Sequence, residues 1–488
     1  MNFKTKLKLT NIKYHRLIAW VGAIALLIFT LSGLTHPIMS WTSPKSKIFF
    51  PPKAIINAEQ IMEIDDILIK NNIKKFIMAK IVPYEEGVIL QVTEEEKSPR
   101  RYFDLKNQQE LENYDEKYAI WLARYYTGLK DNIKEIKFQN HFDNSYPWVN
   151  RLLPIYKITF DHEDNYSAFI YTELGALASL SNNYKSNMQM IFKNLHTLSW
   201  LNNFENSRVI LMILLLLSIL TLTITGIFMI FLLKNRKMSL KRKLHRLISY
   251  IIFLPLLMFS ISGFYHLLQY SYDENNRGLK MPKIISINKN DFGNQIKLPD
   301  SYQNKQFNAI SLIQNPNGGL LYRFSVPYDK NSQKIDRMSR YKGIPNQKSA
   351  IYFDAKTGEK SSLSDKEIAI NYANKYLGFD NDLIFQTKLI TKFGPNYDFR
   401  NKRLPVWQIN YDSPDGNRIF IDPASGILVD HITNKERYES YSFSFLHKWN
   451  FLTPFTGRFW RDILMVIILS LIIIMTILGI ILLLKKGK

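Results

Sequence analysis

Four long apolar segments interrupt an otherwise polar sequence. They cover residues 17–35, 209–233, 247–265 and 463–484. Each is long enough to cross the hydrocarbon core of a bilayer, which takes roughly 20 helical residues. The pattern therefore predicts an α-helical membrane protein with four transmembrane helices. Two longer polar segments, at about 37–208 and 267–462, lie between the helices of each pair.

The polar segments show the patterns of both strands and helices. Short runs in which Tyr, Ile and Val alternate with polar residues predict strands, and stretches such as DKEIAINYANKYL (365–377) predict helices. We expect small α+β modules, with as many as two in each polar segment. The aspartate in the segment FDAKTGEK (353–360) is interpreted as a turn former rather than a catalytic acid.

The whole pattern occurs twice. The segments KYHRLIAWVGAIALLIFTLSGLTH (13–36) and KLHRLISYIIFLPLLMFSISGFYH (243–266) share 11 of 24 residues. Later segments also match, for example NLHTLSW (194–200) and FLHKWNF (445–451). We predict an internal tandem duplication, in which each half contains a helix, an extracytoplasmic α+β domain, a histidine segment and a second helix.

The basic residues indicate the orientation in the membrane. The net charge is +22, and Lys and Arg are concentrated before the first helix, between the second and third (234–246), and at the end of the chain (485–488). The positive-inside rule then places both termini in the cytoplasm. We expect a multi-pass protein of the bacterial inner (cytoplasmic) membrane with large periplasmic domains. Acidic residues interleave with the basic ones, so the lipid bilayer is an expected partner and nucleic acid is not.

These considerations give a set of expected boundaries. They are a cytoplasmic stub (1–16), a transmembrane helix (17–36), a periplasmic domain (37–190), an interfacial histidine segment (191–207), a second helix (208–233), a basic loop (234–246), a third helix (247–266), a second periplasmic domain (267–440), a second histidine segment (441–461), a fourth helix (462–484) and a tail (485–488). The first helix resembles a signal peptide, but no small-residue cleavage site follows it, so we expect it to be retained.

Histidine is the residue that carries candidate chemistry. The chain has nine histidines and no cysteine, which excludes disulfides, thiolate metal sites and haem attachment through a C-x-x-C-H motif. Six histidines occupy matched positions in the two halves: His15, His36, His196, His245, His266 and His447. Neutral imidazole ligates haem iron, and two imidazoles from different helices fill both axial positions. A single interfacial histidine is usually an amphipathic anchor, but three matched pairs favour a shared chemical role.

Four of the six histidines are expected at the outer membrane face, enough for two haems. Gly33 and Gly263 stand one helical turn before His36 and His266, where a missing side chain leaves room for a flat macrocycle. Close helix packing is the alternative role of these glycines. The sequence leaves open whether the outer histidines pair within a half or between halves.

His15 and His245 form the remaining pair, at the cytoplasmic face. Each is separated from the outer histidine of its helix by 21 residues, or about 31 Å at 1.5 Å per residue. They are candidates for a third haem site or for interfacial anchors.

The motifs HRLIAW and SGLTH, a later LH before a helix, and the FDAKTGE turn together resemble the bacterial PepSY-associated transmembrane helix family. The resemblance extends over essentially the whole chain and is weaker at FDLKNQQE (103–110), which lacks the glycine. It implies PepSY-like domains and a role similar to that of ferrisiderophore reductases. His36, His196, His266 and His447 would then ligate haem iron, with His15 and His245 as further candidates.

The resemblance also implies cofactors and partners. Haem b is expected, one to three per chain with two as the expected number. The substrate would be a periplasmic ferric siderophore or other ferric chelate, which releases Fe(II) for uptake after reduction. No nucleotide-binding motif is present, so the electron donor would be a quinol or a partner protein. A basic segment at 330–348 is suited to attract an anionic chelate, although it is also typical of a solvated loop.

Two other classes of function fit parts of the sequence. The chain could be a membrane-anchored PepSY binding or regulatory module without redox activity, or a component for iron or siderophore transport. The matched histidines argue against a simple anchor. The lack of charged residues inside the apolar segments argues against a transport path.

Overall fold

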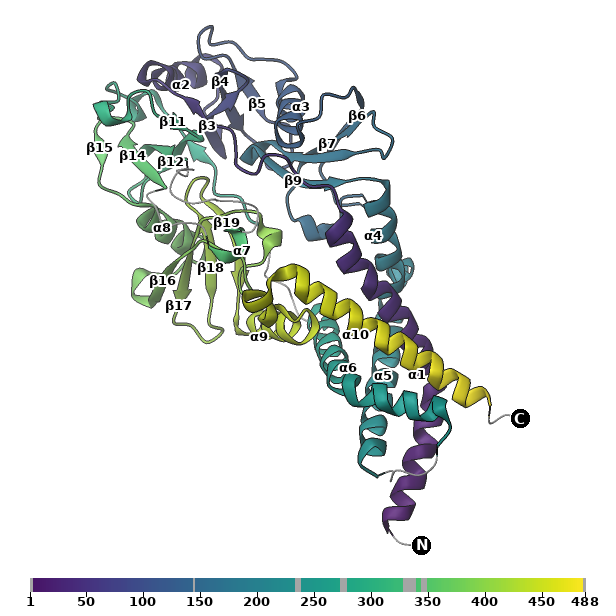
Figure 1. The fold of residues 1–488 in the computed structure, drawn as a ribbon. Coiled ribbons are helices and arrows are strands. Elements are labelled where there is room, and N and C mark those ends of the chain that lie inside the picture. The colour runs from purple at the N-terminus through teal and green to yellow at the C-terminus, as the bar shows by residue number, and fades with distance from the viewer. Residues whose placement is uncertain are drawn as a thin grey trace. The chain divides into compact units, whose positions relative to one another are not determined.

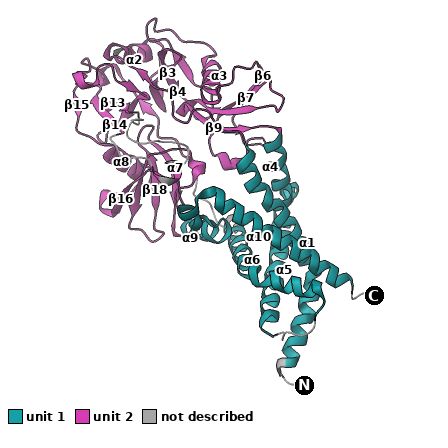
Figure 2. Cartoon of the chain, in the orientation of Figure 1, with its two compact units in different colours: residues 1–43, 184–275, 435–488 teal, residues 44–183, 276–434 magenta. Residues whose placement is uncertain are grey.

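The computed structural model describes residues 3–143, 145–232, 238–272, 279–327, 339–343 and 349–485. The chain forms two compact units (Figure 2). The helical unit comprises residues 1–43, 184–275 and 435–488, and the α/β unit comprises residues 44–183 and 276–434. Most of the basic segment 330–348, part of the loop 234–246 and most of the tail 485–488 lie outside the described residues.

Four long helices form the helical unit (Figure 1). They are α1 (Phe3–Thr42), α5 (Glu205–Leu232), α6 (Leu240–Tyr272) and α10 (Thr453–Leu484). All four are long and apolar enough to cross a membrane, as the sequence predicted. Helix α1 packs against α5 and α10, and α6 packs against the same two helices. In the contacts α1–α10 and α5–α6, one helix comes from each half of the chain.

Apolar side chains from all four helices fill the centre of this bundle. Ala25, Ile252 and Ile472 are fully buried there. A close approach of α1 to α5 depends on Gly22, because an added Cβ would lie 3.1 Å from Leu222 Cδ2. Small residues allow this kind of approach between membrane helices.

Short helices precede α5 and α10. They are α4 (Asn183–His196), η3 (Ser199–Phe204), α9 (Asn434–Ser442), the π-helical turn η8 (Phe443–His447) and η9 (Asn450–Leu452). After each histidine the chain turns through a residue in the left-handed conformation, Leu198 (φ 50°) and Trp449 (φ 51°). Bulky residues seldom adopt this conformation, so its occurrence at both places marks the same sharp turn in the two histidine segments.

Among the described residues, the α/β unit contains one large seven-stranded sheet, two four-stranded sheets and two two-stranded sheets. The large sheet has the order β15-β14-β13-β12-β3-β4-β5. Its strands are β3 (Met78–Tyr84), β4 (Gly87–Thr93), β5 (Arg101–Phe103), β12 (Ala309–Gln314), β13 (Leu320–Ser325), β14 (Ala350–Asp354) and β15 (Lys360–Ser361). The strands β3 and β12 come from different halves and pair antiparallel, with Ile81 opposite Ile310. The sequence predicted a separate domain in each half, whereas the two halves share this sheet.

Each half also has a four-stranded antiparallel sheet. One contains β6 (Ile133–Gln139), β7 (Ile155–Phe160), β8 (Ser167–Tyr171) and β9 (Ala176–Ser181), and the other β16 (Ile384–Ile390), β17 (Val406–Tyr411), β18 (Arg418–Asp422) and β19 (Ile427–Ile432). Two-stranded pairs are formed by β1 (Ala54–Ile55) with β11 (Gln306–Phe307) and by β2 (Lys75–Phe76) with β10 (Ile285–Ser286).

Three helices supply the cores of the α/β unit. They are α2 (Ala58–Lys70), α3 (Tyr114–Thr127) and α8 (Asp365–Leu377). Helix α3 packs its buried face, including Leu122, between β6–β9 and the large sheet, and α8 does the same with Ile368 between β16–β19 and the large sheet. Helix α8 has the range predicted from the sequence, and a capping box of Ser364 with Glu367 starts it.

The predicted aspartate turn is confirmed. Asp354 Oδ1 accepts the backbone N–H groups of Lys356 and Thr357, both at 2.9 Å, and Gly358 has φ 70°. Asp104 makes the same contacts in the first half, where Gln108 takes the left-handed conformation at φ 55°. The turn therefore forms without the glycine.

Candidate functional site

The four outer histidines (His36, His196, His266 and His447) are named for the face of the membrane at which the sequence predicts them. In the first half, Phe192 lies between two of them. Its ring stacks on His196 with centroids 4.6 Å apart and tilts against His36 at 6.2 Å. Phe192 and His196 are one helical turn apart on α4, which is why their rings meet.

The second half repeats this arrangement. Phe443 stacks on His447 at 4.6 Å and on His266 at 4.1 Å. The two halves then join, because the His196 and His447 rings lie 6.2 Å apart in an edge-to-face contact. We call the six rings the aromatic row, in the order His36, Phe192, His196, His447, Phe443 and His266. The structure thus brings His196 and His447 together between halves, and His36 and His266 each contact the phenylalanine of their own half.

Two serines determine which nitrogen of the central histidines is available. Ser32 Oγ donates its single proton to the Ile28 carbonyl (2.6 Å) and lies 3.0 Å from His196 Nδ1. Since a hydroxyl has one proton, the Nδ1–H of His196 must donate to Ser32. Its Nε2 then carries the lone pair.

The same argument applies to the other half. Ser262 Oγ donates to the Met258 carbonyl (2.7 Å) and lies 3.2 Å from His447 Nδ1. His447 therefore donates from Nδ1 and presents a lone pair on Nε2. Metal-bound histidines commonly donate their second ring N–H to such a partner, so both rings are in the state that a ligand needs.

His266 has a different partner. Its Nδ1 hydrogen-bonds the carboxylate of Glu439 on α9, and this carboxylate is 5% exposed. An ionised carboxylate only accepts hydrogen bonds, so His266 donates from Nδ1 and carries its lone pair on Nε2. His196 and His447 are 251 residues apart in the sequence. The same offset matches Glu439 with Met188 of the first half. The first half therefore has no carboxylate at the matching position.

The inner histidines, His15 and His245, also have their Nδ1 atoms occupied. His15 Nδ1 lies 3.0 Å from Thr225 Oγ1, which donates to the Thr221 carbonyl, and His245 Nδ1 lies 3.0 Å from the Met475 carbonyl. Both rings are therefore donors through Nδ1.

Glycines lie against the inner histidines. An added Cβ at Gly226 would be 3.7 Å from His15 Cε1, and one at Gly479 would be 3.3 Å from His245 Cε1. The glycines that the sequence highlighted lie mainly against leucines. An added Cβ would meet Leu469 at 3.7 Å from Gly33, and Leu216 at 3.7 Å and His447 Cε1 at 3.9 Å from Gly263. The leucines next to these glycines come from neighbouring helices, which is consistent with close helix packing. A role for Gly33 and Gly263 in making room for a macrocycle stays a prediction.

The donor set fits haem better than a bare metal ion. In the described part of the chain, no three or more His, Cys, Asp or Glu side chains gather as they would around an ion. Haem iron needs only two axial ligands, and five of the six matched histidines hold an Nε2 lone pair by the hydrogen bonds described above. The unmatched histidines lie in the α/β unit, where His431 Nε2 hydrogen-bonds Asn417.

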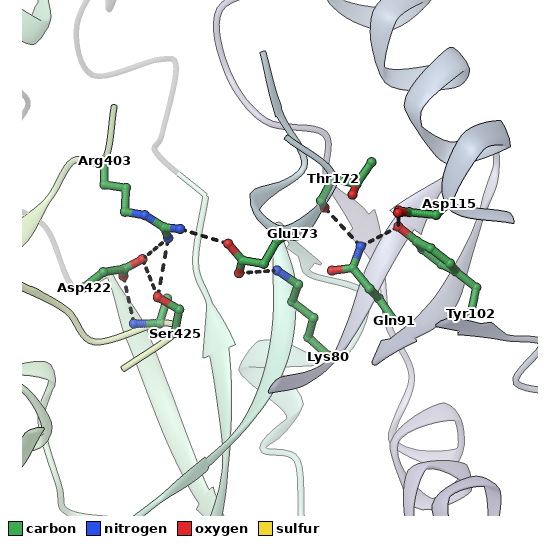
Figure 3. Close-up of polar contacts among 10 residues, drawn as sticks. Lys80, Gln91, Tyr102, Asp115, Thr172, Glu173, Arg403, Asp422 and Ser425 are labelled. Carbon is green, nitrogen blue, oxygen red and sulfur yellow. Dashed lines mark hydrogen bonds and ion pairs between the residues drawn. The ribbon is translucent and has the colours of Figure 1, made fainter. Parts of the chain in front are cut away.

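A chain of buried ion pairs joins the two halves within the α/β unit (Figure 3). Glu173 contacts Lys80 from its own half at 3.2 Å and Arg403 from the other half at 2.9 Å. Arg403 continues to Asp422 at 2.6 Å, and Asp422 accepts a hydrogen bond from Ser425. The Glu173 carboxylate is fully buried, so its charge depends on these partners.

The partners of Glu173 determine its pKa. Burial alone would raise the pKa, but Lys80 and Arg403 outweigh burial and lower it to about 2. A second buried group lies nearby, where Tyr102 donates to Asp115 and Gln91 donates to Tyr102. The charges of Lys80, Glu173, Arg403 and Asp422 balance, which is typical of a structural network rather than a catalytic one. Two buried atoms of these groups, Gln91 Oε1 and Arg403 Nε, have no hydrogen-bond partner among the described residues.

The sequence analysis missed several of these residues. Phe192 and Phe443 lie in a shared F-x-x-L-H motif, and Ser32 and Ser262 precede the matched glycines, so aligning the two halves would have identified them. Glu439 has no such signal, because the halves differ at that position. Comparison with known protein families gives no match, and comparison with curated proteins gives none either.

Proposed function

We propose that this chain is a membrane-embedded b-type haem protein that passes electrons to a ferric chelate. The observation that carries the proposal is the aromatic row, in which His196 and His447 meet between halves with their Nδ1 atoms bound to Ser32 and Ser262. An interfacial anchor needs neither the contact nor the orientation. The orientation, with Nδ1–H donated to a partner, is the one that ligation by Nε2 commonly uses.

Each residue of the row has a definable task under this proposal. The outer histidines would hold haem, and the serines would fix the tautomer and ring angle of His196 and His447 so that each binds through Nε2. Bound haem would supply a one-electron Fe(III)/Fe(II) couple. The phenylalanines Phe192 and Phe443 pack on the imidazole rings and exclude water around them. His15 and His245 are candidates for a further haem.

The substrate follows from the coordination chemistry of iron. Siderophores bind Fe(III) through hard oxygen donors and hold the softer Fe(II) poorly, so transfer of one electron to each chelated Fe(III) releases the metal. We place the PepSY-like domains and this reaction on the periplasmic side of a bacterial inner membrane, with both termini in the cytoplasm and a quinol or partner protein as donor. The basic segments of the sequence and the tandem duplication support this arrangement.

The first test is to count the haem. The full chain is purified in detergent, its spectrum is recorded oxidised and after dithionite reduction, and haem per chain is measured by a pyridine haemochrome assay. We expect sharp α bands of low-spin b-type haem at one or more per chain. A folded preparation that stays colourless after haem supplementation would contradict the proposal and favour a binding module.

The second test addresses the substrate. Reduced protein is mixed with a ferric hydroxamate chelate, and reoxidation is followed at the α band. The gallium chelate is the matched control, because Ga(III) has the same charge and geometry but does not accept an electron. Reoxidation by the iron chelate alone is expected, and equal rates with both would exclude electron transfer to the metal.

A further inference from the structure

Helix α3 carries a line of oxidisable side chains in the first half of the α/β unit. Tyr118, Trp121 and Tyr125 are spaced three and four residues apart, so they share one face of the helix. The ring of Trp121 stacks on the rings of Tyr118 and Tyr125, in both cases with centroids 5.7 Å apart. The ring of Tyr102, on β5, lies 5.5 Å from that of Tyr118. We call these four residues the α3 stack.

The α3 stack connects the interior of the unit to its surface. Tyr102 is 0% exposed and Tyr118 is 1% exposed, whereas Trp121 and Tyr125 are only partly buried. All three ring contacts fall within the range of about 4.5–7 Å that is typical of aromatic pairs. The rate of electron transfer falls steeply with distance, so an unbroken series of ring contacts favours transfer between the solvent and Tyr102.

The buried end of the stack has a proton acceptor. Tyr102 Oη donates a hydrogen bond to Asp115 Oδ1 at 2.8 Å (Figure 3), and Gln91 donates to Tyr102 Oη at 2.6 Å. Burial raises the pKa of the Asp115 carboxyl, which makes its carboxylate a better proton acceptor. A phenol becomes a much stronger acid when it loses an electron. Asp115 is therefore placed to take the proton of an oxidised Tyr102 directly.

The internal duplication shows that the fold does not require the stack. In the second half, Tyr352 donates to Asp365, and these residues lie 250 positions after Tyr102 and Asp115. The same offset matches the three aromatic residues of α3 with Ile368, Asn371 and Lys375 of α8. Helix α8 nevertheless packs between a four-stranded sheet and the large sheet, as α3 does. The stacked rings are therefore an addition to the first half.

We propose that the α3 stack is a one-electron relay, in which Tyr102 is reversibly oxidised and Trp121 connects it to the solvent. An oxygen-centred radical in solution takes one electron from Trp121 and one proton from the solvent. Trp121 then takes an electron from Tyr102 across the Tyr118 ring, while the O–H bond of Tyr102 breaks and its proton moves to the Asp115 carboxylate. The products are a neutral tyrosyl radical and a carboxylic acid.

A reductant in solution completes the cycle. A thiolate gives one electron to the relay and becomes a thiyl radical, the electron reaches Tyr102 by the same route, and Asp115 returns the proton. The resulting activity is the removal of one-electron oxidants at the surface of the α/β unit, with the radical held in the interior until it is reduced. This activity needs no haem, so it does not rest on the proposed function.

The test is photochemical oxidation of the full chain in detergent, with any bound haem in the Fe(III) state. A laser flash generates a ruthenium(III) polypyridyl oxidant, and radicals are followed by transient absorption and, after freezing, by electron paramagnetic resonance. We expect a tryptophan radical to be replaced by a long-lived tyrosyl radical. The replacement should be slower in D₂O, because a proton moves to Asp115. Tyr102→Phe should lose the long-lived signal.

Trp121→Phe tests the route without changing the hydrogen bond of Tyr102 to Asp115. It keeps a ring that is hard to oxidise at a partly buried position, and it should also lose the long-lived signal. Trp148→Phe is the matched control, at a 46% exposed tryptophan of η1 (Trp148–Asn150) in the same unit. Tyr352→Phe is the control for the buried phenol. Both controls should keep the signal.

Circular dichroism establishes that each variant is folded before the radicals are compared. A folded Tyr102→Phe variant that forms the native amount of long-lived tyrosyl radical would overturn the proposal. A Trp121→Phe variant with native kinetics would overturn it as well, because the electron would then bypass the stack. Since no step involves haem, a colourless preparation that forms the Tyr102 radical would contradict the proposed function and leave this inference in place.

Discussion

The rings of His196 and His447 lie 6.2 Å apart, although 251 residues separate them in the sequence. Each ring is stacked on a phenylalanine of its own half, so two equivalent segments meet edge to edge inside the helical unit. The contact places His196 and His447, which match in the two halves, next to each other. It is the relationship on which the proposed haem function depends most directly.

Replacing either central histidine should therefore remove haem. We expect His447→Ala to lower haem per chain by at least one equivalent in the pyridine haemochrome assay, because the Nε2 donor is lost. His141→Ala is the control, since His141 is an exposed, unmatched histidine of the α/β unit. Unchanged haem in both His447→Ala and His196→Ala would remove these residues from the set of ligands.

The serine partners should affect affinity rather than the presence of the site. Ser262→Ala frees the Nδ1–H of His447, and loss of such a partner typically lowers metal affinity 10–100-fold. Haem titration of the haem-free protein measures the effect. Ser260→Ala is a matched control two residues away, because the buried Ser260 hydroxyl donates to the Leu256 carbonyl of its own helix. Equal affinities in the two variants would contradict the role of Ser262.

The ion-pair chain should make the α/β unit sensitive to acid. The pKa of Glu173 is lowered from 4.5 to about 2, so its contribution to stability is complete above pH 4.5 and is lost as the pH falls towards 2. Glu173→Gln should cost about 3–5 kcal/mol at pH 7, because it leaves Lys80 and Arg403 without their anion. It should also flatten the fall in stability between pH 4.5 and 2. Thermal unfolding of the full chain across this range is the measurement.

A surface pair provides the control for that experiment. Glu110 pairs with Arg101 at 2.6 Å, and the Arg101 and Glu110 side chains are 34% and 37% exposed. Glu110→Gln should change the free energy of unfolding by about 1 kcal/mol or less. A Glu173→Gln variant as stable as Glu110→Gln at pH 7 would show that the buried chain contributes little.

The inner glycines make a prediction about packing. An alanine Cβ at Gly479 would lie 3.3 Å from His245 Cε1, which is closer than ordinary contact, whereas at Gly226 the distance to His15 would be 3.7 Å. We expect Gly479→Ala to destabilise the protein by about 1–3 kcal/mol, as overpacking commonly does, and Gly226→Ala to cost less. Thermal unfolding of the two variants in the same detergent compares them, and the reverse order would contradict this geometry.

The sequence predicted the features that depend on local pattern. Apolar segments of about 20 residues predicted the four long helices, and the described part of the chain has four helices of that kind. The range of α8 and the turn at Asp354 follow from capping and turn chemistry within a few residues. Matched histidines also identified the candidate site, because the halves could be compared within a single chain.

Only the tertiary structure decided how the halves combine. The pairing of β3 with β12 and the ion pair of Glu173 with Arg403 join residues more than 200 positions apart. The contact of His196 with His447 and the partnership of His266 with Glu439 likewise depend on helix packing between distant segments. The local sequence around each of these residues does not indicate which distant residue it will contact. Such contacts depend on where the folded backbone places both residues and not on local propensity. The sequence by itself determined the elements and the candidate ligands, and the packing of the two halves determined which of them meet.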